Sequence, residues 1–183
     1  MLLECKLKMN KTRTLTFAAL MAALSSLLSI PPFSIPIAFG PFTSEIHFNQ
    51  IPIFISGILA GPWAGLLTGA TGGLYMSITR IPFIIIGLAI LGLATGFFAK
   101  RLKLKPFFAI ILAWCVQAPY VLMSDYLWFV FFTPIPYSVV LTTIITILVK
   151  LSIEALISAT FVAILIPYIQ RLGLFTKGQT TES

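Results

Sequence analysis

The few charged residues of this chain are gathered into short clusters that separate long apolar runs. Charged residues make up 9% of the 183 positions and hydrophobic residues 58%, whereas a soluble domain carries about 25% charged residues. Apolar runs of this length are typical of segments that span a bilayer. We therefore expect an integral membrane protein. Ten of the twelve basic residues form three clusters, which are Lys6, Lys8, Lys11 and Arg13, then Lys100, Arg101, Lys103 and Lys105, and finally Arg171 and Lys177.

The positions of prolines, glycines and basic clusters predict an all-α fold with six transmembrane helices. Basic clusters next to membrane helices remain in the cytoplasm, and five or seven crossings would leave one cluster outside. Both termini are therefore expected to be cytoplasmic. Residues 32–45 should form an outer loop that packs over or into the membrane domain. The helices are expected at about residues 14–30, 46–60, 63–78, 83–99, 106–132 and 137–170, with Pro119 interrupting the fifth.

These helices form one membrane domain, residues 14–170, between two cytoplasmic tails, residues 1–13 and 171–183. The start is either Met1 or Met9, because Met1–Lys8 adds little that the fold needs. The arrangement predicts a multi-pass protein of the plasma membrane.

Several function classes are disfavoured. The net charge of +7 is explained by the basic loops, and no basic surface with interleaved aromatic residues indicates nucleic-acid binding. Cys5 and Cys115 lie in a tail and in an apolar run, so they predict neither a disulfide nor a metal site. Catalytic motifs and a phosphate-binding loop are missing from the sequence. We therefore expect no catalytic residues, no cofactor and no enzyme activity.

Three consecutive motifs resemble the substrate-binding S components of energy-coupling factor (ECF) transporters. His47–Ile53 reads as an aromatic-polar-x-Pro start of the second helix, Ile58–Gly65 contains a small-Gly-Pro-x-x-Gly turn, and Gly69–Gly72 belongs to a glycine-rich third helix. The resemblance extends over residues 14–170. The sequence Asn49-Gln50 departs from the family, which often has an aspartate before this proline.

The resemblance implies a six-helix bundle that binds a water-soluble vitamin or related micronutrient at its outer face. Such a subunit works with a transmembrane T component and two cytoplasmic ATPases, which supply the ATP hydrolysis. Small residues of the first helix look like the family's surface for docking on the T component, namely Ala18, Ala19, Ala22 and Ala23.

A stand-alone secondary transporter is the alternative, although inverted repeats are not evident. A small intramembrane enzyme would need convergent catalytic residues, which Lys150 and Glu154 alone do not provide.

Ionisable and polar residues within the helices are candidates for substrate binding because they are costly in lipid. Lys150 and Glu154 lie one helical turn apart near the midplane, and Gln117 lies at a similar depth in the fifth helix. Either Lys150 and Glu154 pair only with each other, or Lys150 contacts an anionic or carbonyl group of the substrate.

Further candidates lie near the outer side. Asp125 and Tyr126 suit a site that stacks a flat ring, or else belong to an interfacial aromatic belt, the role favoured for Trp128. Arg80, in the outer loop after the third helix, either clamps an anionic substrate or reaches lipid headgroups.

Asn49 and Gln50 cluster with Glu45 and His47 where the first outer loop meets the second helix. A lone histidine is usually structural, and a metal site is not expected. The nutrient stays open, since the aromatic residues favour a planar ring such as a flavin, pyrimidine or pterin, whereas the cations favour an acid such as pantothenate or biotin.

Overall fold

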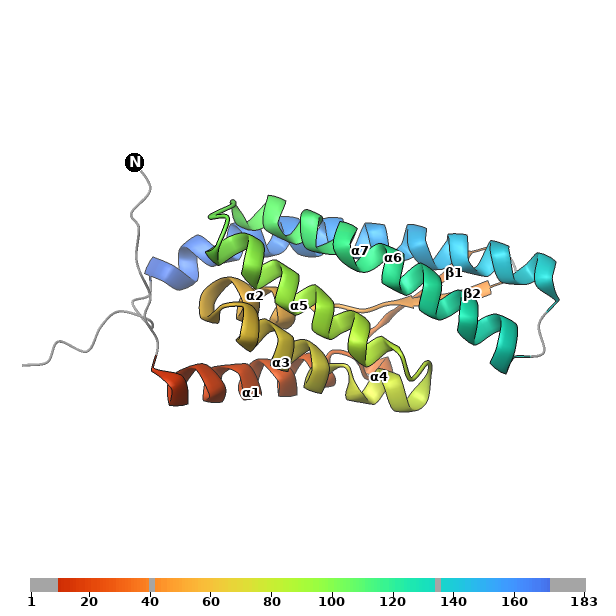
Figure 1. Ribbon diagram of the computed structural model, residues 1–183, viewed down its shortest axis with the longest axis horizontal. Coiled ribbons are helices and arrows are strands. Elements are labelled where there is room, and N and C mark those ends of the chain that lie inside the picture. The colour runs from red at the N-terminus through yellow and green to blue at the C-terminus, as the bar shows by residue number, and fades with distance from the viewer. Residues whose placement is uncertain (1–9, 40–41, 134–135, 172–183) are drawn as a thin grey trace, which may run out of the picture.

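The computed structural model describes residues 10–39, 42–133 and 136–171, which form a helical bundle with one β-hairpin (Figure 1). α3 and α4 follow each other almost directly, so the described helices make six segments, as predicted. The elements are α1 Lys11–Leu27, a 3-10 helix Pro31–Phe33, β1 Ile35–Phe39, β2 Phe42–Ile46, α2 Gln50–Ala60, α3 Pro62–Gly72, α4 Leu74–Thr79, α5 Ile84–Lys100, α6 Pro106–Phe132 and α7 Tyr137–Arg171.

The two predicted tails lie largely outside the described residues, as does the choice between Met1 and Met9. α1 begins at Lys11, a few residues inside the segment expected to be the N-terminal tail. By length and composition, α6 and α7 could each cross a membrane, while α2 and α5 are shorter apolar helices.

The expected outer loop over residues 32–45 is instead a β-hairpin. β1 and β2 pair antiparallel, with Ile35 opposite Ile46 and Phe39 opposite Phe42. The prolines of this segment were the reason for expecting an irregular loop. A proline such as Pro36 is nevertheless compatible with a two-stranded sheet, because each strand has an edge where a backbone N–H is not required.

The expected interruption at Pro119 was also wrong. α6 is one helix from Pro106 to Phe132 with Pro119 inside it. Membrane helices tolerate an internal proline because neighbouring groups can satisfy the freed backbone carbonyl.

α2 lies at the centre of the bundle, where Ile53 and Phe54 are fully buried. α3 and α5 pack closely at two glycines, since a Cβ atom on Gly65 would collide with the backbone of Gly92, and the reverse also holds. Close backbone approach through small residues is a common way to pack helices in lipid. Gly61 ends α2 at φ 105°, and Pro62 begins α3, which forms the tight turn predicted there.

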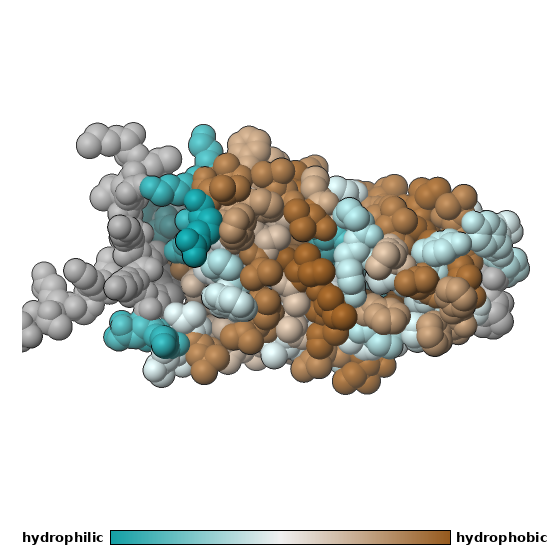
Figure 2. Space-filling model, in the orientation of Figure 1, coloured by the Kyte–Doolittle hydropathy of each residue, from teal (hydrophilic) through white to brown (hydrophobic). Residues whose placement is uncertain are grey.

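The start of α1, the α5–α6 connection and the end of α7 lie together at one end of the bundle (Figure 1). Figure 2 shows strongly hydrophilic side chains gathered toward this end and hydrophobic side chains over much of the remaining visible surface. Among the basic residues of the described chain, only Arg80 and Lys150 belong to the other parts of the bundle. We call the end formed by the start of α1, the α5–α6 connection and the end of α7 the basic end.

Candidate functional site

A cavity of about 420 Å³ lies in the half of the bundle away from the basic end. Its walls come from the residues just before and at the start of α2, the end of α4, the start of α5, and the facing sides of α6 and α7. The volume falls in the range of small-molecule sites, and most of the wall is apolar, as such sites usually are.

α6 and α7 line the cavity with regular helical stripes, in which cavity-facing positions recur at i, i+3 and i+4. This spacing keeps one face of each helix on the cavity over three turns. α6 contributes Gln117, Tyr120, Val121, Ser124, Asp125, Trp128 and Phe129, and α7 contributes Thr143, Thr146, Ile147, Lys150, Leu151 and Glu154.

Most of the sequence-predicted substrate residues come together in this wall. Tyr126 does not, because it lies off the α6 stripe and is exposed. Asp125 and Gln117 are both buried on the α6 stripe. Whether the wall residues bind substrate stays a prediction. Those that lie in the wall are Asn49, Gln50, Arg80, Gln117, Asp125, Lys150 and Glu154.

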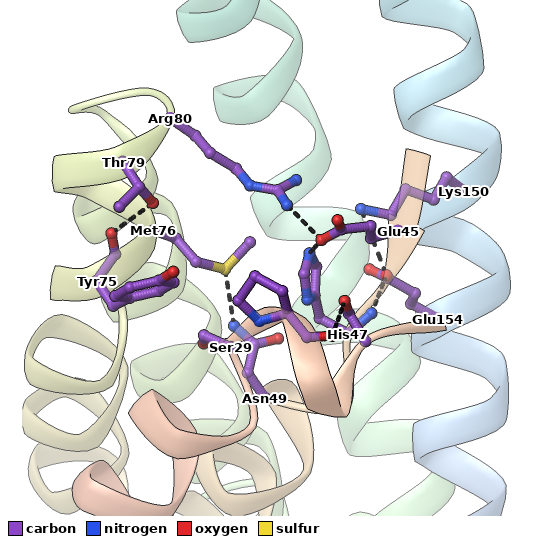
Figure 3. A network of polar contacts seen from close by, with 12 residues as sticks. Ser29, Glu45, His47, Asn49, Tyr75, Met76, Thr79, Arg80, Lys150 and Glu154 are labelled. Atoms are coloured by element: carbon purple, nitrogen blue, oxygen red, sulfur yellow. Dashed lines mark hydrogen bonds and ion pairs between the residues drawn. The ribbon is translucent and has the colours of Figure 1, made fainter. Parts of the chain in front are cut away.

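Lys150 and Glu154 pair with each other and also line the cavity. The Lys150 Nζ lies 3.5 Å from Oε1 of Glu154, and both side chains are almost completely buried. The backbone N–H of His47 donates to the same Glu154 oxygen at 2.8 Å. One carboxylate thus joins α7 to the segment that leads into α2 (Figure 3).

Arg80 forms an ion pair at the more exposed side of this network. Its Nη2 donates to Oε2 of Glu45 at 2.6 Å, and the two side chains are 39% and 31% exposed. Figure 3 shows Arg80 reaching from the end of α4 toward Glu45 on β2. Partial burial opposes ionisation of Glu45, but a hydrogen bond with Ser34 and the Arg80 guanidinium together hold its pKa below the ordinary value.

Buried polar atoms without a hydrogen-bond partner mark the wall near α2. In the part of the chain that the structure describes, these atoms are Nδ1 and Nε2 of His47, Oε1 of Gln50 and Oγ of Ser158. His47 and Gln50 both line the cavity. A buried polar atom without a partner is costly, so a bound ligand that supplied partners would gain affinity here.

His47 is therefore a candidate for substrate binding, although a lone histidine in the sequence was expected to be structural. Its position beside the polar residues Glu45, Asn49 and Gln50 was the sequence feature that could have indicated this role. Asn49 is already engaged, since its side-chain Nδ2 contacts Sδ of Met76 at 3.1 Å and its backbone carbonyl oxygen accepts from Ser25 Oγ at 2.8 Å.

The aromatic part of the wall centres on Trp128. Its ring stacks on Phe132 with centroids 5.0 Å apart, and it meets Phe83 edge to face at 6.3 Å. Trp128 was expected to belong to an interfacial aromatic belt. The structure places Trp128, together with Phe83, in the cavity wall.

The four alanines proposed for docking lie on two different faces of α1. Ala18 and Ala22 are buried, and Thr68 of α3 donates a hydrogen bond to the Ala18 carbonyl. Ala19 and Ala23 are exposed. Within the described residues, no three potential metal-ligating His, Cys, Asp or Glu side chains are grouped.

His47 gives the stability of the protein a pH dependence of defined sign. Burial, together with the positive charges of Lys150 and Arg80, lowers the pKa of His47 to about 4 from its ordinary 6.5, against an opposing effect of Glu45. As the pH falls below about 6.5, the unfolded chain takes up a proton that the folded protein rejects until about pH 4. The folded state therefore loses stability across this window.

We expect the melting temperature of the detergent-solubilised wild type to fall relative to that of His47→Gln between pH 7 and pH 5, because only the wild type carries this buried imidazole. The carboxyl groups are present in both proteins, so the difference reports His47 together with its effect on the pKa of Glu45. Equal falls in the two proteins would show that His47 is not held neutral by the fold.

Comparison with known families agrees with this architecture. A family model described as ECF-type riboflavin transporter, S component, matches residues 9–171. No curated protein and no solved structure matches the chain. S components are helical membrane proteins that bind substrate for their transporter and are not enzymes. The match covers nearly all of the sequence, including every described helix, and the chain belongs to the family of ECF transporter S components.

Proposed function

We propose that this chain binds riboflavin at the outer face of the plasma membrane and delivers it to an ECF transporter. The observation that carries the proposal is the cavity, which combines an aromatic wall with buried hydrogen-bonding atoms that lack partners. The description of the matching family supports the same vitamin.

The chemistry of riboflavin suits this wall. Its isoalloxazine ring is planar, with an apolar dimethylbenzene edge and a pyrimidine edge that both donates and accepts hydrogen bonds. Trp128 and Phe83 offer aromatic surface for the ring. His47 and Gln50 offer buried polar atoms without partners for the pyrimidine edge.

The alternative of a vitamin acid is less well supported. Arg80 and Lys150 are the cations of the described cavity wall, and each already faces a carboxylate, Glu45 and Glu154 respectively. The clamp on an anionic substrate that we considered for Arg80 would require breaking its ion pair with Glu45.

The distribution of charge supports the orientation. With the basic end in the cytoplasm, the cavity opens toward the outside and six segments cross the membrane with both ends inside. In this proposal a T component and two cytoplasmic ATPases drive uptake, because the chain's own motifs provide no site for ATP hydrolysis.

A matched pair of α6 variants tests riboflavin binding at this cavity. Trp128→Ala removes aromatic surface from the wall, whereas Tyr126→Ala removes a ring two residues away that lies outside it. We expect the purified wild type to quench riboflavin fluorescence on binding, Trp128→Ala to bind about tenfold more weakly or worse, and Tyr126→Ala to bind as the wild type. Lack of riboflavin binding by the folded wild type, or equal losses in both variants, would contradict the proposal.

A second pair tests docking through the exposed face of α1. Ala23→Leu adds bulk at an exposed position of α1, and Cys115→Leu adds bulk at an exposed position of α6. If the T component packs on Ala19 and Ala23, only Ala23→Leu should reduce riboflavin uptake by cells that express the whole transporter, while both variants bind riboflavin normally. Normal uptake by Ala23→Leu would remove this face from the docking surface.

A further inference from the structure

The charged groups around the cavity are matched so that no cation is in surplus. Among the described residues, Arg80 and Lys150 are the cations, and Glu45, Glu154 and Asp125 are the carboxyl groups at or beside the cavity. The Lys150 Nζ lies 3.5 Å from Oε1 of Glu154, and the Arg80 Nη2 lies 2.6 Å from Oε2 of Glu45. Whether Asp125 is ionised or neutral, both cations are compensated.

The two ion pairs differ in their surroundings. Lys150 and Glu154 are buried, and the Glu154 carboxylate also accepts the His47 N–H, so removing it would take this partner from both Lys150 and the His47 N–H. Arg80 and Glu45 are about one-third exposed and join the α4–α5 connection to β2 at the cavity wall (Figure 3). The Arg80–Glu45 pair is therefore the more accessible of the two, and its contact with the buried network is Glu45 Oε2, 3.6 Å from Nε2 of His47.

A phosphate group would be poorly accommodated at such a wall. A phosphate monoester carries a charge of about −1.5 to −2 at neutral pH. Transfer of this charge from water into the cavity is costly unless a cation pairs with the phosphate. At this site Glu45 would compete with it for Arg80, and the Glu154 carboxylate would repel it. An uncharged ligand meets neither obstacle.

We propose that Glu45 is a specificity-determining residue, which, by holding Arg80, makes the site select uncharged riboflavin over its 5′-phosphate ester. This inference rests on the proposed function. It also requires that the ribityl chain point toward Arg80, whose ion pair is the more exposed of the two.

The test compares riboflavin and riboflavin 5′-phosphate binding to the purified full-length protein by fluorescence quenching. The wild type should bind the phosphate ester at least about tenfold more weakly than riboflavin. Glu45→Gln keeps the shape of the side chain and releases Arg80, so the affinity for the phosphate ester should rise about tenfold or more. Riboflavin affinity should change little, which also shows that the variant is folded.

A double variant identifies the group responsible. Glu45→Gln combined with Arg80→Gln lacks the released cation, so the ratio of phosphate-ester affinity to riboflavin affinity should return to about the wild-type ratio. The gain in Glu45→Gln should also shrink as salt is raised, because the Arg80 pair is partly exposed.

The outcomes separate this inference from the proposed function. If the wild type binds riboflavin but binds the phosphate ester equally well, or if Glu45→Gln leaves the ratio of the two affinities unchanged, the role of Glu45 is refuted and riboflavin binding stands. If the folded wild type binds neither flavin, both proposals are refuted.

Discussion

The position of the Glu154 carboxylate holds the cavity together. It lies on α7, faces Lys150 one turn away, and accepts the backbone N–H of His47 from the segment before α2. A carboxylate this deeply buried is tolerated only when charge and hydrogen bonds compensate it. These contacts fix the β2–α2 connection against α7, and the cavity forms between this connection, α6 and the ends of α4 and α5.

The pairing of each cation with a carboxylate also explains how a cavity with a mostly apolar wall can contain charged side chains. The cations of the described wall are engaged by carboxylates, so the groups left for a ligand are neutral ones, the imidazole of His47 and the amide of Gln50. The aromatic rings around Trp128 add a flat apolar surface. A planar, uncharged molecule with a hydrogen-bonding edge fits this combination better than a small organic acid.

The helices were largely predictable because apolar runs, Gly-Pro turns and basic clusters act locally. α6 and α7 begin at the predicted residues, Pro106 and Tyr137, since a proline lies at or immediately before each start. The hairpin was missed because the pairing of β1 with β2 depends on contacts between strands that proline-rich composition conceals. Within the site, Asp125 and Trp128 are three positions apart and share the cavity-facing side of α6. Tyr126 does not have this spacing, so helical periodicity places it on another side of the helix.

The electrostatic partners could not be read from the sequence. Glu45 and Arg80 are 35 positions apart, and His47 and Glu154 are 107 positions apart, so only the fold brings them together. The same limit applied to α1, where helical periodicity alone did not show which pair of alanines faces α3.

The most direct test of the account is an experimental structure of the full-length protein with riboflavin bound. We expect the isoalloxazine ring in the cavity between α6 and α7, against Trp128, with the polar edge of the ring or the ribityl hydroxyl groups bonded to His47 or Gln50. Riboflavin bound elsewhere on the protein, with this cavity lacking the ring, would contradict it.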